Sequence, residues 1–260
     1  MLDDIALTFA SAPGLAWLRY ATAFWFGAIA MSFAGVVVDR LPHQLGWRDD
    51  PMPGLSIVRP ASRCDGCGHR VGWLRLLPVL GYFFAKGRCG HCGMRVRLRY
   101  PTMEVAGGLL ACASVLHFGT QQHAVWAAAL WLVLLFLAWI DACEQWLPAV
   151  VTLPLFWTGL LASPFEPDIW SRAVGGALGF GATWAAMALT SRLKRIDAFA
   201  GGDVALVSAA GAWLGWTHLP MFLILAALGF LVYALPARRS GRVWMPFGPA
   251  LSLSFALCLL

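Results

Sequence analysis

The sequence predicts an all-α polytopic membrane protein with about eight transmembrane helices and a small zinc-ribbon-like domain between the first two. Hydrophobic residues make up 60% of the 260 residues and charged residues only 12%, whereas soluble domains carry about 25% charged residues. Apolar stretches recur along the whole chain, which excludes a soluble domain with one anchor. A single globular core cannot bury this much apolar surface, so most of it must face lipid.

Apolar runs define the expected helices. The first, at 16–38, is too long for a signal-peptide core and lacks a small-residue cleavage site after it, so we expect it to be retained. Segment 203–216 is rich in small residues, which favour packing against protein rather than lipid. Several runs are shorter than the roughly 20 residues that span a bilayer. The remaining helices are expected at 104–118, 124–140, 148–163, 171–190, 203–216, 219–235 and 245–260.

These segments divide the chain into three parts. We expect a first transmembrane helix in 1–38, a cytoplasmic zinc-binding loop domain in 39–103 and a transmembrane domain in 104–260. The last of these would hold the chemistry, because the polar residues discussed below interrupt its apolar runs.

The distribution of basic residues predicts the orientation. The net charge is +6, but the basic residues lie in discrete segments between apolar runs, so we expect membrane lipids and no nucleic acid as partners. With the N-terminus outside, all Lys and Arg except Arg19 and Arg172 lie in the inside loops 39–103, 141–147, 191–202 and 236–244. Such asymmetry places the large loop in the cytoplasm. Its basic residues would also favour anionic headgroups, by about 1 kcal/mol each near the surface.

Four of the seven cysteines lie in the large loop as two C-x-x-C motifs, Cys64 with Cys67 and Cys89 with Cys92. This spacing can place four thiolates tetrahedrally around one zinc ion, and disulfides are the weaker alternative in a reducing cytoplasm. A four-thiolate site has no open coordination position, so the zinc would be structural. The remaining Cys112, Cys143 and Cys258 are expected to be small buried hydrophobic residues.

Two acidic residues interrupt apolar surroundings. Asp141 directly follows a ten-residue apolar run, and Asp203 follows Gly201 and Gly202 and opens another apolar segment. Asp141 alone could be a boundary residue and Asp203 alone a helix cap, but both are expected at the same membrane boundary, where acidic residues usually have a function. Two adjacent carboxyls would share one proton. The ionised one could then activate water while the other hydrogen-bonds a carbonyl. The two glycines would let a peptide backbone approach Asp203 closely.

Taken together, the motifs resemble those of the type IV prepilin peptidase family, a group of GxGD-type membrane aspartyl proteases, along nearly the whole chain. Asp141 followed by Leu147-Pro148 is similar to the first aspartate motif of the family, and Gly202-Asp203 to the end of its G-x-G-D motif. The other matching segments are Met31-Ser32-Phe33 through Arg40-Leu41-Pro42, the two cysteine motifs with Gly87-Arg88-Cys89, Arg99-Tyr100-Pro101 leading to Glu104, Gly211 to Trp216, and Pro246-Phe247-Gly248-Pro249.

The resemblance implies an enzyme of the bacterial inner membrane that removes leader peptides from type IV prepilins or secretion pseudopilins at the cytoplasmic face. Asp141 and Asp203 would be the catalytic pair, and 104–260 the protease domain. Many members also methylate the new N-terminus with S-adenosylmethionine, and Glu104 and Gly87 match positions tied to that reaction. Nothing in the residues themselves indicates methyl transfer, so this part rests on analogy.

Several positions depart from the family pattern. Ala200 stands where the G-x-G-D motif begins with glycine, and Ala205 where a lysine is common. Cys143 and Ala149 occupy positions where a further acid is frequent, and Gly35 replaces a common asparagine. These departures affect the expected rate, substrate preference and methylation, while both predicted catalytic acids remain.

Two other classes of protein fit parts of the sequence. One is a transporter or ion-conducting protein with a zinc-ribbon loop, in which the buried acids form a proton or cation relay. No inverted repeat or interrupted helix pair is apparent to support it. The other is an inactive membrane adaptor for pilus or secretion assembly, suggested by the altered motif surroundings. A cleavage assay with a purified precursor separates these classes from a protease.

Overall fold

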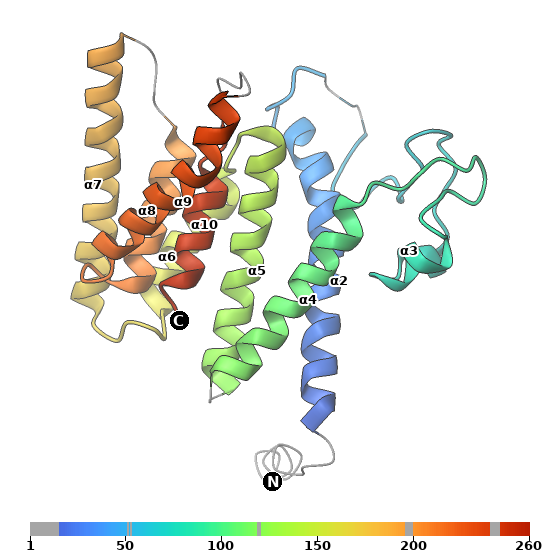
Figure 1. Ribbon diagram of the computed structural model, residues 1–260, viewed down its shortest axis with the longest axis horizontal. Coiled ribbons are helices and arrows are strands. Elements are labelled where there is room, and N and C mark those ends of the chain that lie inside the picture. Colours follow the sequence, from blue (N-terminus) through green and yellow to red (C-terminus); the bar gives the residue numbers. More distant parts are fainter. Residues whose placement is uncertain (1–15, 51, 53, 119–120, 196–199, 240–244) are drawn as a thin grey trace. The chain divides into compact units, whose positions relative to one another are not determined.

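The structure is a computed structural model that describes residues 16–50, 52, 54–118, 121–195, 200–239 and 245–260. These residues form helices and connecting loops with no β-strand, so the predicted all-α fold is confirmed (Figure 1). The elements are α2 (Ala16–Gln44), η2 (Trp73–Leu76), α3 (Leu80–Phe84), α4 (Arg99–His117), α5 (Gln121–Glu144), α6 (Ala149–Ala162), α7 (Ile169–Lys194), α8 (Gly201–Leu214), α9 (Leu219–Arg239) and α10 (Gly248–Leu257).

Each of the eight predicted apolar segments overlaps one of the longer helices of the described chain. Four of these helices, α2, α5, α7 and α9, are long and apolar enough to cross a membrane. Helices α6, α8 and α10 are apolar but shorter, and a helix of 14 residues such as α8 is only about 21 Å long. The polytopic membrane character is therefore confirmed, while eight crossings stay a prediction.

Several helices extend beyond their predicted bounds, and the largest differences are in α2 and α4. Helix α2 continues past residue 38 to Gln44, and α4 begins at Arg99 rather than at residue 104. The extra turns bring Asp39 of α2 against Arg99 and Tyr100 of α4, where opposite charge and hydrogen bonds offset the polar character of these residues. Pro101 lies in the first turn of α4, where a missing backbone N–H is tolerated.

The chain forms two compact units, residues 1–132 and 133–260, with α5 contributing to both. In the first unit, α2 and α4 pack through glycines. A Cβ added at Gly27 would collide with the carbonyl oxygen of Gly107, and one at Gly108 with the ring of Phe24. Small residues let two helix backbones approach closely, which is how helices associate in the absence of a strong hydrophobic driving force in lipid.

In the second unit, α8 is the central helix. Every residue from Leu206 to Leu214 is buried, and α8 packs against α6, α7, α9 and α10. Gly211 meets Gly175 of α7 so closely that neither position has room for a Cβ. Trp213 donates from its indole Nε1 to the carbonyl of Leu155 in α6 at 2.9 Å. The prediction that this segment packs against protein is confirmed, and its burial explains how so short a helix is accommodated.

Some predicted features lie outside the described residues. These are parts of the inside loops 191–202 and 236–244, namely 196–199 and 240–244 with Arg242, and the start of the chain before residue 16.

Candidate functional site

Asp141 lies in the last turn of α5 and is buried, with 5% of its surface exposed. Its carboxyl Oδ2 accepts a buried hydrogen bond of 2.7 Å from the backbone N–H of Gly248, the first residue of α10. A Cβ at Gly248 would lie 2.6 Å from Oδ2 and 2.8 Å from Cγ of Asp141. Only glycine therefore lets the α10 backbone reach this carboxyl, and the Pro246-Phe247-Gly248-Pro249 motif acquires a physical role.

Asp203 lies in the first turn of α8 and is brought near Asp141 by a second glycine contact. A Cβ at Gly202 would lie 2.6 Å from Cβ and 2.8 Å from the carbonyl oxygen of Leu147, which follows the end of α5. Leu147 itself is buried. The Leu147-Pro148 turn, six residues after Asp141, thus docks directly against the residue before Asp203.

The two carboxyls lie within electrostatic range of each other inside the second unit. Asp203 is partly buried, and its carboxyl has no hydrogen-bond partner among the residues that the structure describes. The two predicted acids are therefore brought near each other, at the end of α5 and the start of α8 in one compact unit. An arrangement of one hydrogen-bonded and one free carboxyl is suited to holding a single proton between them.

Tyr233 is a site residue that the sequence analysis did not identify. It lies in α9 within electrostatic range of both acids, and its hydroxyl donates a short hydrogen bond to the carbonyl of Pro246. Because Pro246 is two residues before Gly248, this bond fixes the turn that delivers the N–H to Asp141. The sequence signal that could have identified Tyr233 is that it carries the single phenol in the otherwise apolar run 219–235.

The glycines before Asp203 have different surroundings. Gly202 packs against Leu147, which gives this glycine a structural reason within the chain itself. Gly201 is exposed. Close approach of a substrate backbone therefore stays a prediction that fits Gly201 better than Gly202.

The four loop cysteines come together as predicted. The Sγ atoms of Cys64, Cys67, Cys89 and Cys92 all lie within 4.8 Å of one another. The distance is 3.7 Å between Cys64 and Cys92 and 3.9 Å between Cys67 and Cys89. Thiolates at the corners of a tetrahedron around zinc, with Zn–S bonds of about 2.3 Å, would be about 3.8 Å apart. The residues therefore fit a structural zinc ion.

The two cysteine motifs form nearly identical turns. In the first, the N–H of Cys64 donates to His69 and that of Gly68 to Cys64; in the second, Cys89 donates to Met94 and Gly93 to Cys89, all at 2.8–2.9 Å. Isolated bridges between Arg63 and Arg70 and between Arg88 and Arg95 close the turns. Gly68 and Gly93 have φ of +67° and +73°, values that glycine adopts without a steric penalty.

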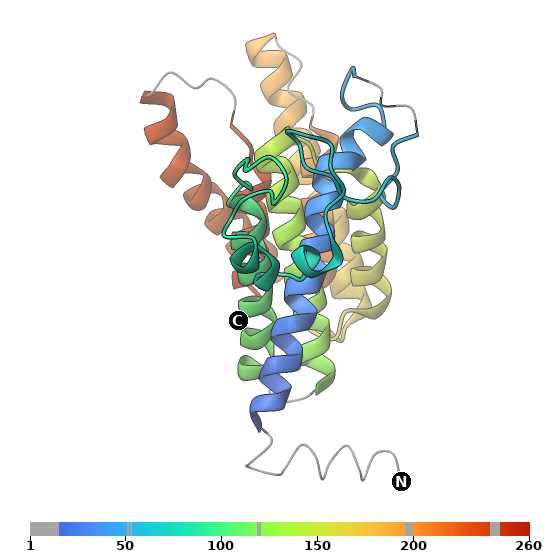
Figure 2. The same ribbon diagram turned by 90° about the vertical axis from the view of Figure 1, so that its right-hand side faces the viewer.

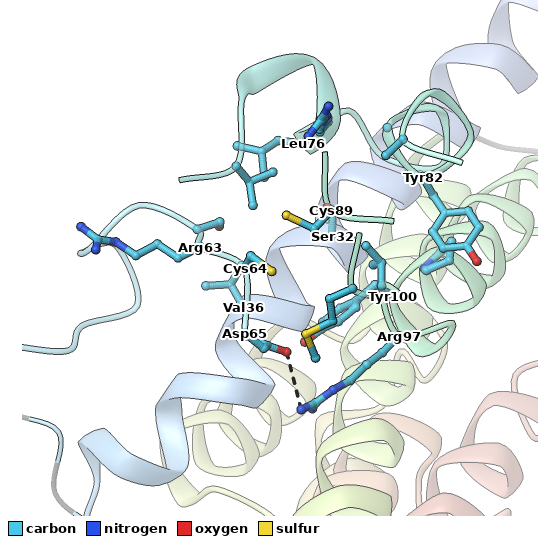
Figure 3. Close-up of a pocket in the computed structure, with 18 of the residues that line it drawn as sticks. Ser32, Val36, Arg63, Cys64, Asp65, Leu76, Tyr82, Cys89, Arg97 and Tyr100 are labelled. Atoms are coloured by element: carbon cyan, nitrogen blue, oxygen red, sulfur yellow. Dashed lines mark ion pairs between the residues drawn. The ribbon is translucent and has the colours of Figure 1, made fainter. Parts of the chain in front are cut away.

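A cavity of about 340 Å³ lies beside the cysteine cluster and is formed wholly by the first unit (Figure 3). Its walls include Ser32 and Val36 of α2, Tyr82 of α3, and Cys64 and Cys89. Glu104 of α4 also lines it, is buried, and accepts a hydrogen bond of 2.7 Å from the backbone N–H of Val79. A carboxylate has further lone pairs, so Glu104 can take a second donor from a bound molecule.

Gly87, the other residue tied by resemblance to methyl transfer, does not line this cavity. It follows α3 with φ of +65°, and a Cβ there would lie 2.6 Å from the hydroxyl of Tyr82. Gly87 therefore allows the turn that holds Tyr82 in the cavity wall, and it supports the cavity through Tyr82 without lining it.

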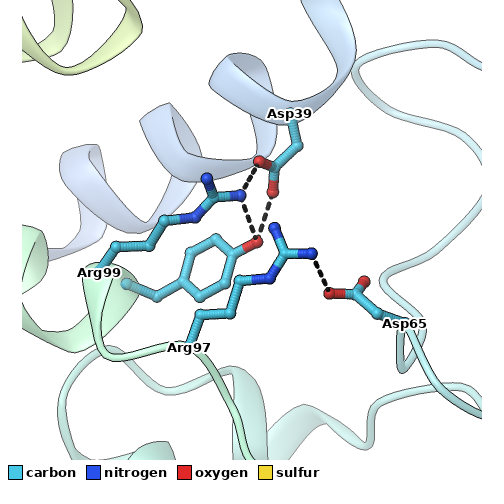
Figure 4. Close-up of polar contacts among 5 residues, drawn as sticks. Asp39, Asp65, Arg97 and Arg99 are labelled. Carbon is cyan, nitrogen blue, oxygen red and sulfur yellow. Dashed lines mark hydrogen bonds and ion pairs between the residues drawn. The ribbon is translucent and has the colours of Figure 1, made fainter. Parts of the chain in front are cut away.

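A polar cluster joins α2 to the start of α4 at the edge of the cavity (Figure 4). Asp39 accepts hydrogen bonds of 2.5 Å from both Arg99 and Tyr100. Arg97 pairs with Asp65 of the first cysteine motif at 3.5 Å. Burial raises the pKa of Tyr100, so its hydroxyl stays protonated as the donor to Asp39.

The prediction for the other three cysteines is wrong. Cys143 is exposed, and Cys112 and Cys258 are only partly buried. The apolar segments that contain them are expected to face lipid, where a small thiol is tolerated without burial inside the protein.

Comparisons with family models and with curated proteins assign this chain to the same family. Residues 25–118 match the family model described as bacterial peptidase A24 N-terminal domain, and residues 126–235 match the type IV leader peptidase family. No solved structure matches the chain.

Three curated relatives span most of the chain, each named prepilin leader peptidase/N-methyltransferase. That of Burkholderia pseudomallei (strain 1026b) is 34% identical over 93% of this chain and 85% of its own length. The Klebsiella pneumoniae protein is 35% identical over 87% and 99%, and the Aeromonas hydrophila protein 31% identical over 98% and 95%, respectively.

The cysteine geometry makes a prediction about metal content. Replacing Cys64 with Ser removes one of four ligands, so the purified protein should lose most of its bound zinc, from about one ion per chain. Cys143→Ser, at an exposed cysteine outside the cluster, should leave the zinc content unchanged. Elemental analysis by mass spectrometry measures both variants. Full zinc retention in Cys64→Ser would contradict the four-thiolate site.

Proposed function

Because this chain belongs to the type IV leader peptidase family, we propose that it is a membrane aspartyl endopeptidase in which Asp141 and Asp203 are the catalytic pair. Its substrates are type IV prepilins or secretion pseudopilins, from which it removes the leader peptide. The observation that supports the proposal is that these two carboxyls lie within electrostatic range of each other in one compact unit, with Gly248 donating a hydrogen bond to one of them.

The proposed reaction uses the asymmetry of the pair. The Gly248 N–H stabilises negative charge on Asp141, since a hydrogen bond to a carboxylate favours its ionised form. Asp141 then accepts a proton from an attacking water while protonated Asp203 hydrogen-bonds the scissile carbonyl. The carbonyl oxygen gains negative charge as water adds to the carbon, and the proton on Asp203 neutralises it. Collapse of the adduct breaks the peptide bond as the amine takes the proton from Asp141 and one hydroxyl of the adduct returns a proton to Asp203.

We propose further that the membrane is the bacterial inner membrane and that the cysteine domain, residues 39–103, lies on its cytoplasmic side. The basic residues of this region support that orientation. The protease domain, 104–260, then presents Asp141 and Asp203 at the same face, where a substrate leader is accessible. Zinc in the cysteine cluster would fold the domain rather than take part in cleavage.

Methyl transfer is the second proposed activity, and it is located in the first unit. The cavity beside the cysteine cluster is at the small end of the range of about 300–1,000 Å³ typical of ligand pockets. Glu104 would accept a hydrogen bond from the methyl donor, S-adenosylmethionine, and Gly87 would keep Tyr82 in the wall. When bound, the donor supplies an electrophilic methyl group for the new N-terminal amine.

Loss of either acid should abolish cleavage. We expect Asp141→Asn and Asp203→Asn each to lower the rate of precursor cleavage by about 10³-fold, because the amide can neither hold nor release the shared proton. Glu144→Gln, which removes an acid from the same end of α5, is the matched control and should cleave normally. The measurement is mass spectrometry of a purified prepilin incubated with each variant in detergent. Normal cleavage by either Asn variant would refute the pair.

Adding a methyl group at Gly248 should lower the rate of precursor cleavage, as the Asp→Asn substitutions do. Gly248→Ala places a Cβ against the Asp141 carboxyl and displaces it, and a shift of about 1 Å at a reacting group can lower the rate about 100-fold. Gly229→Ala in α9 is the control, since a Cβ there meets only Ala250 at 3.8 Å. Initial rates of precursor cleavage compare the two. Equal rates would mean that the Gly248 contact does not set the site.

The two activities should separate at Glu104. Glu104→Gln keeps an oxygen for the Val79 N–H but loses the charge, so we expect methylation of the cleaved product to fall about tenfold while cleavage continues. Asp49→Asn, an exposed acid outside the cavity, is the control. Mass spectrometry of one sample measures both the loss of the leader and the mass of about 14 Da that each methylation adds. Unchanged methylation would move the donor site elsewhere.

A further inference from the structure

An exposed apolar surface covers the segment between the two cysteine motifs. This segment, Trp73–Phe84, contains η2 and α3 and is called the η2–α3 segment below. No residue of η2 is buried, and in α3 only Gly81 is. Trp73, Phe83 and Phe84 expose between 65% and 73% of their surfaces, and four leucines are also exposed: Leu74, Leu76, Leu77 and Leu80. A water-soluble surface rarely keeps so many large apolar side chains together.

Basic residues outnumber acidic ones around the η2–α3 segment. Glu104 accepts a hydrogen bond from Val79, and Arg97 and Arg99 are paired with Asp65 and Asp39. Between Asp65 and Glu104 the chain has no acidic residue, but it has seven basic ones: Arg70, Arg75, Lys86, Arg88, Arg95, Arg97 and Arg99. Aromatic and leucine side chains combined with Lys and Arg are typical of elements that lie in the plane of a membrane interface. Each basic residue near an anionic leaflet contributes about 1 kcal/mol. The surface is thus complementary in charge to anionic phospholipid.

The η2–α3 segment also lies at a suitable depth. Leu76, Leu77 and Tyr82 share a cavity with Ser32 of α2, and both ribbon views place α3 beside the middle of α2 (Figures 1 and 2). Ser32 is seven residues before Asp39, which puts it about 10 Å further along the helix axis. The same cavity is also lined by Asp39 and Arg40. Because α2 is long and apolar enough to cross a membrane, the η2–α3 segment lies where the apolar part of α2 meets its polar end.

One contact joins the η2–α3 segment to α4, and a second fixes the fold of the segment itself. The N–H of Val79 donates to Glu104 of α4, and Gly81 packs against the backbone of Arg75 without room for a Cβ. Val79 has a φ of +60°, a conformation that is unfavourable for a β-branched residue. Val79 is therefore a strained residue at the turn between η2 and α3.

We propose that the η2–α3 segment is seated in the lipid–water interface of the membrane, bound to anionic phospholipid. Trp73, Phe83 and Phe84 reach the boundary of the acyl chains, while Lys86 and Arg88 lie at the phosphates. The segment holds the cysteine domain flat on the bilayer, so that the cavity with Glu104 opens near the membrane surface. This proposal does not depend on the peptidase or methyl-transfer activities.

Photocrosslinking of the full-length protein in lipid vesicles tests the proposal. Benzoyl-phenylalanine is placed at Phe83 in one variant and at Val58 in another, and both are reconstituted into vesicles of phosphatidylglycerol and phosphatidylethanolamine. Val58 is the matched control, because it is 72% exposed and belongs to the same loop region but lies outside the segment. We expect lipid adducts, detected by mass spectrometry, to be about fivefold more abundant at 83 than at 58.

A second variant with the probe at Trp73 keeps the test open if the Phe83 substitution does not fold, as judged by its elution in detergent. Equal lipid adducts at 83 and 58, or none at 83 and 73, would overturn the proposal. So would adducts with a co-reconstituted prepilin in place of lipid, because the surface would then bind protein. Since crosslinking to lipid requires no turnover, a protein that fails to cleave precursor can still pass this test.

Discussion

The second unit depends on one hydrogen bond, from the backbone N–H of Gly248 to the carboxyl of Asp141. An acidic side chain in an apolar helix is costly to bury without a partner. This bond supplies the partner from the first turn of α10, where helix N–H groups lack partners of their own. Tyr233 then fixes the same turn through Pro246. Asp141, Gly248 and Tyr233 are therefore connected through the same turn at the start of α10.

Glycines allow the helices to come close enough for this arrangement. Gly211 against Gly175 sets α8 beside α7, and Gly202 against Leu147 sets the start of α8 beside the end of α5. At each contact a methyl group would push the backbones apart. The position of Asp203 follows from these contacts, since it is the next residue after Gly202. Contacts at small residues in this chain therefore determine the position of Asp203.

The part of the first unit between α2 and α4 is organised around polar groups instead. Four cysteine Sγ atoms lie together between two similar turns. The pair of Asp65 with Arg97 links the first turn to the chain just before α4, and the pair of Asp39 with Arg99 links α2 to α4. The cavity that results has arginines at its edge and the buried Glu104 in its wall. Figure 3 shows residues that line this cavity, and Figure 4 shows the ion pairs beside it.

The sequence by itself determined the all-α membrane fold, the positions of the longer helices, the cysteine cluster and the family, because apolar runs and fixed motif spacings are local properties of a chain. It also singled out Asp141 and Asp203, as acids at the ends of apolar segments. Only the tertiary structure decided that Gly248 and Tyr233 complete their surroundings, that Gly202 packs on Leu147, and that Gly87 lies outside the cavity. These are contacts between residues up to 107 positions apart, and no local pattern encodes which helix faces will meet.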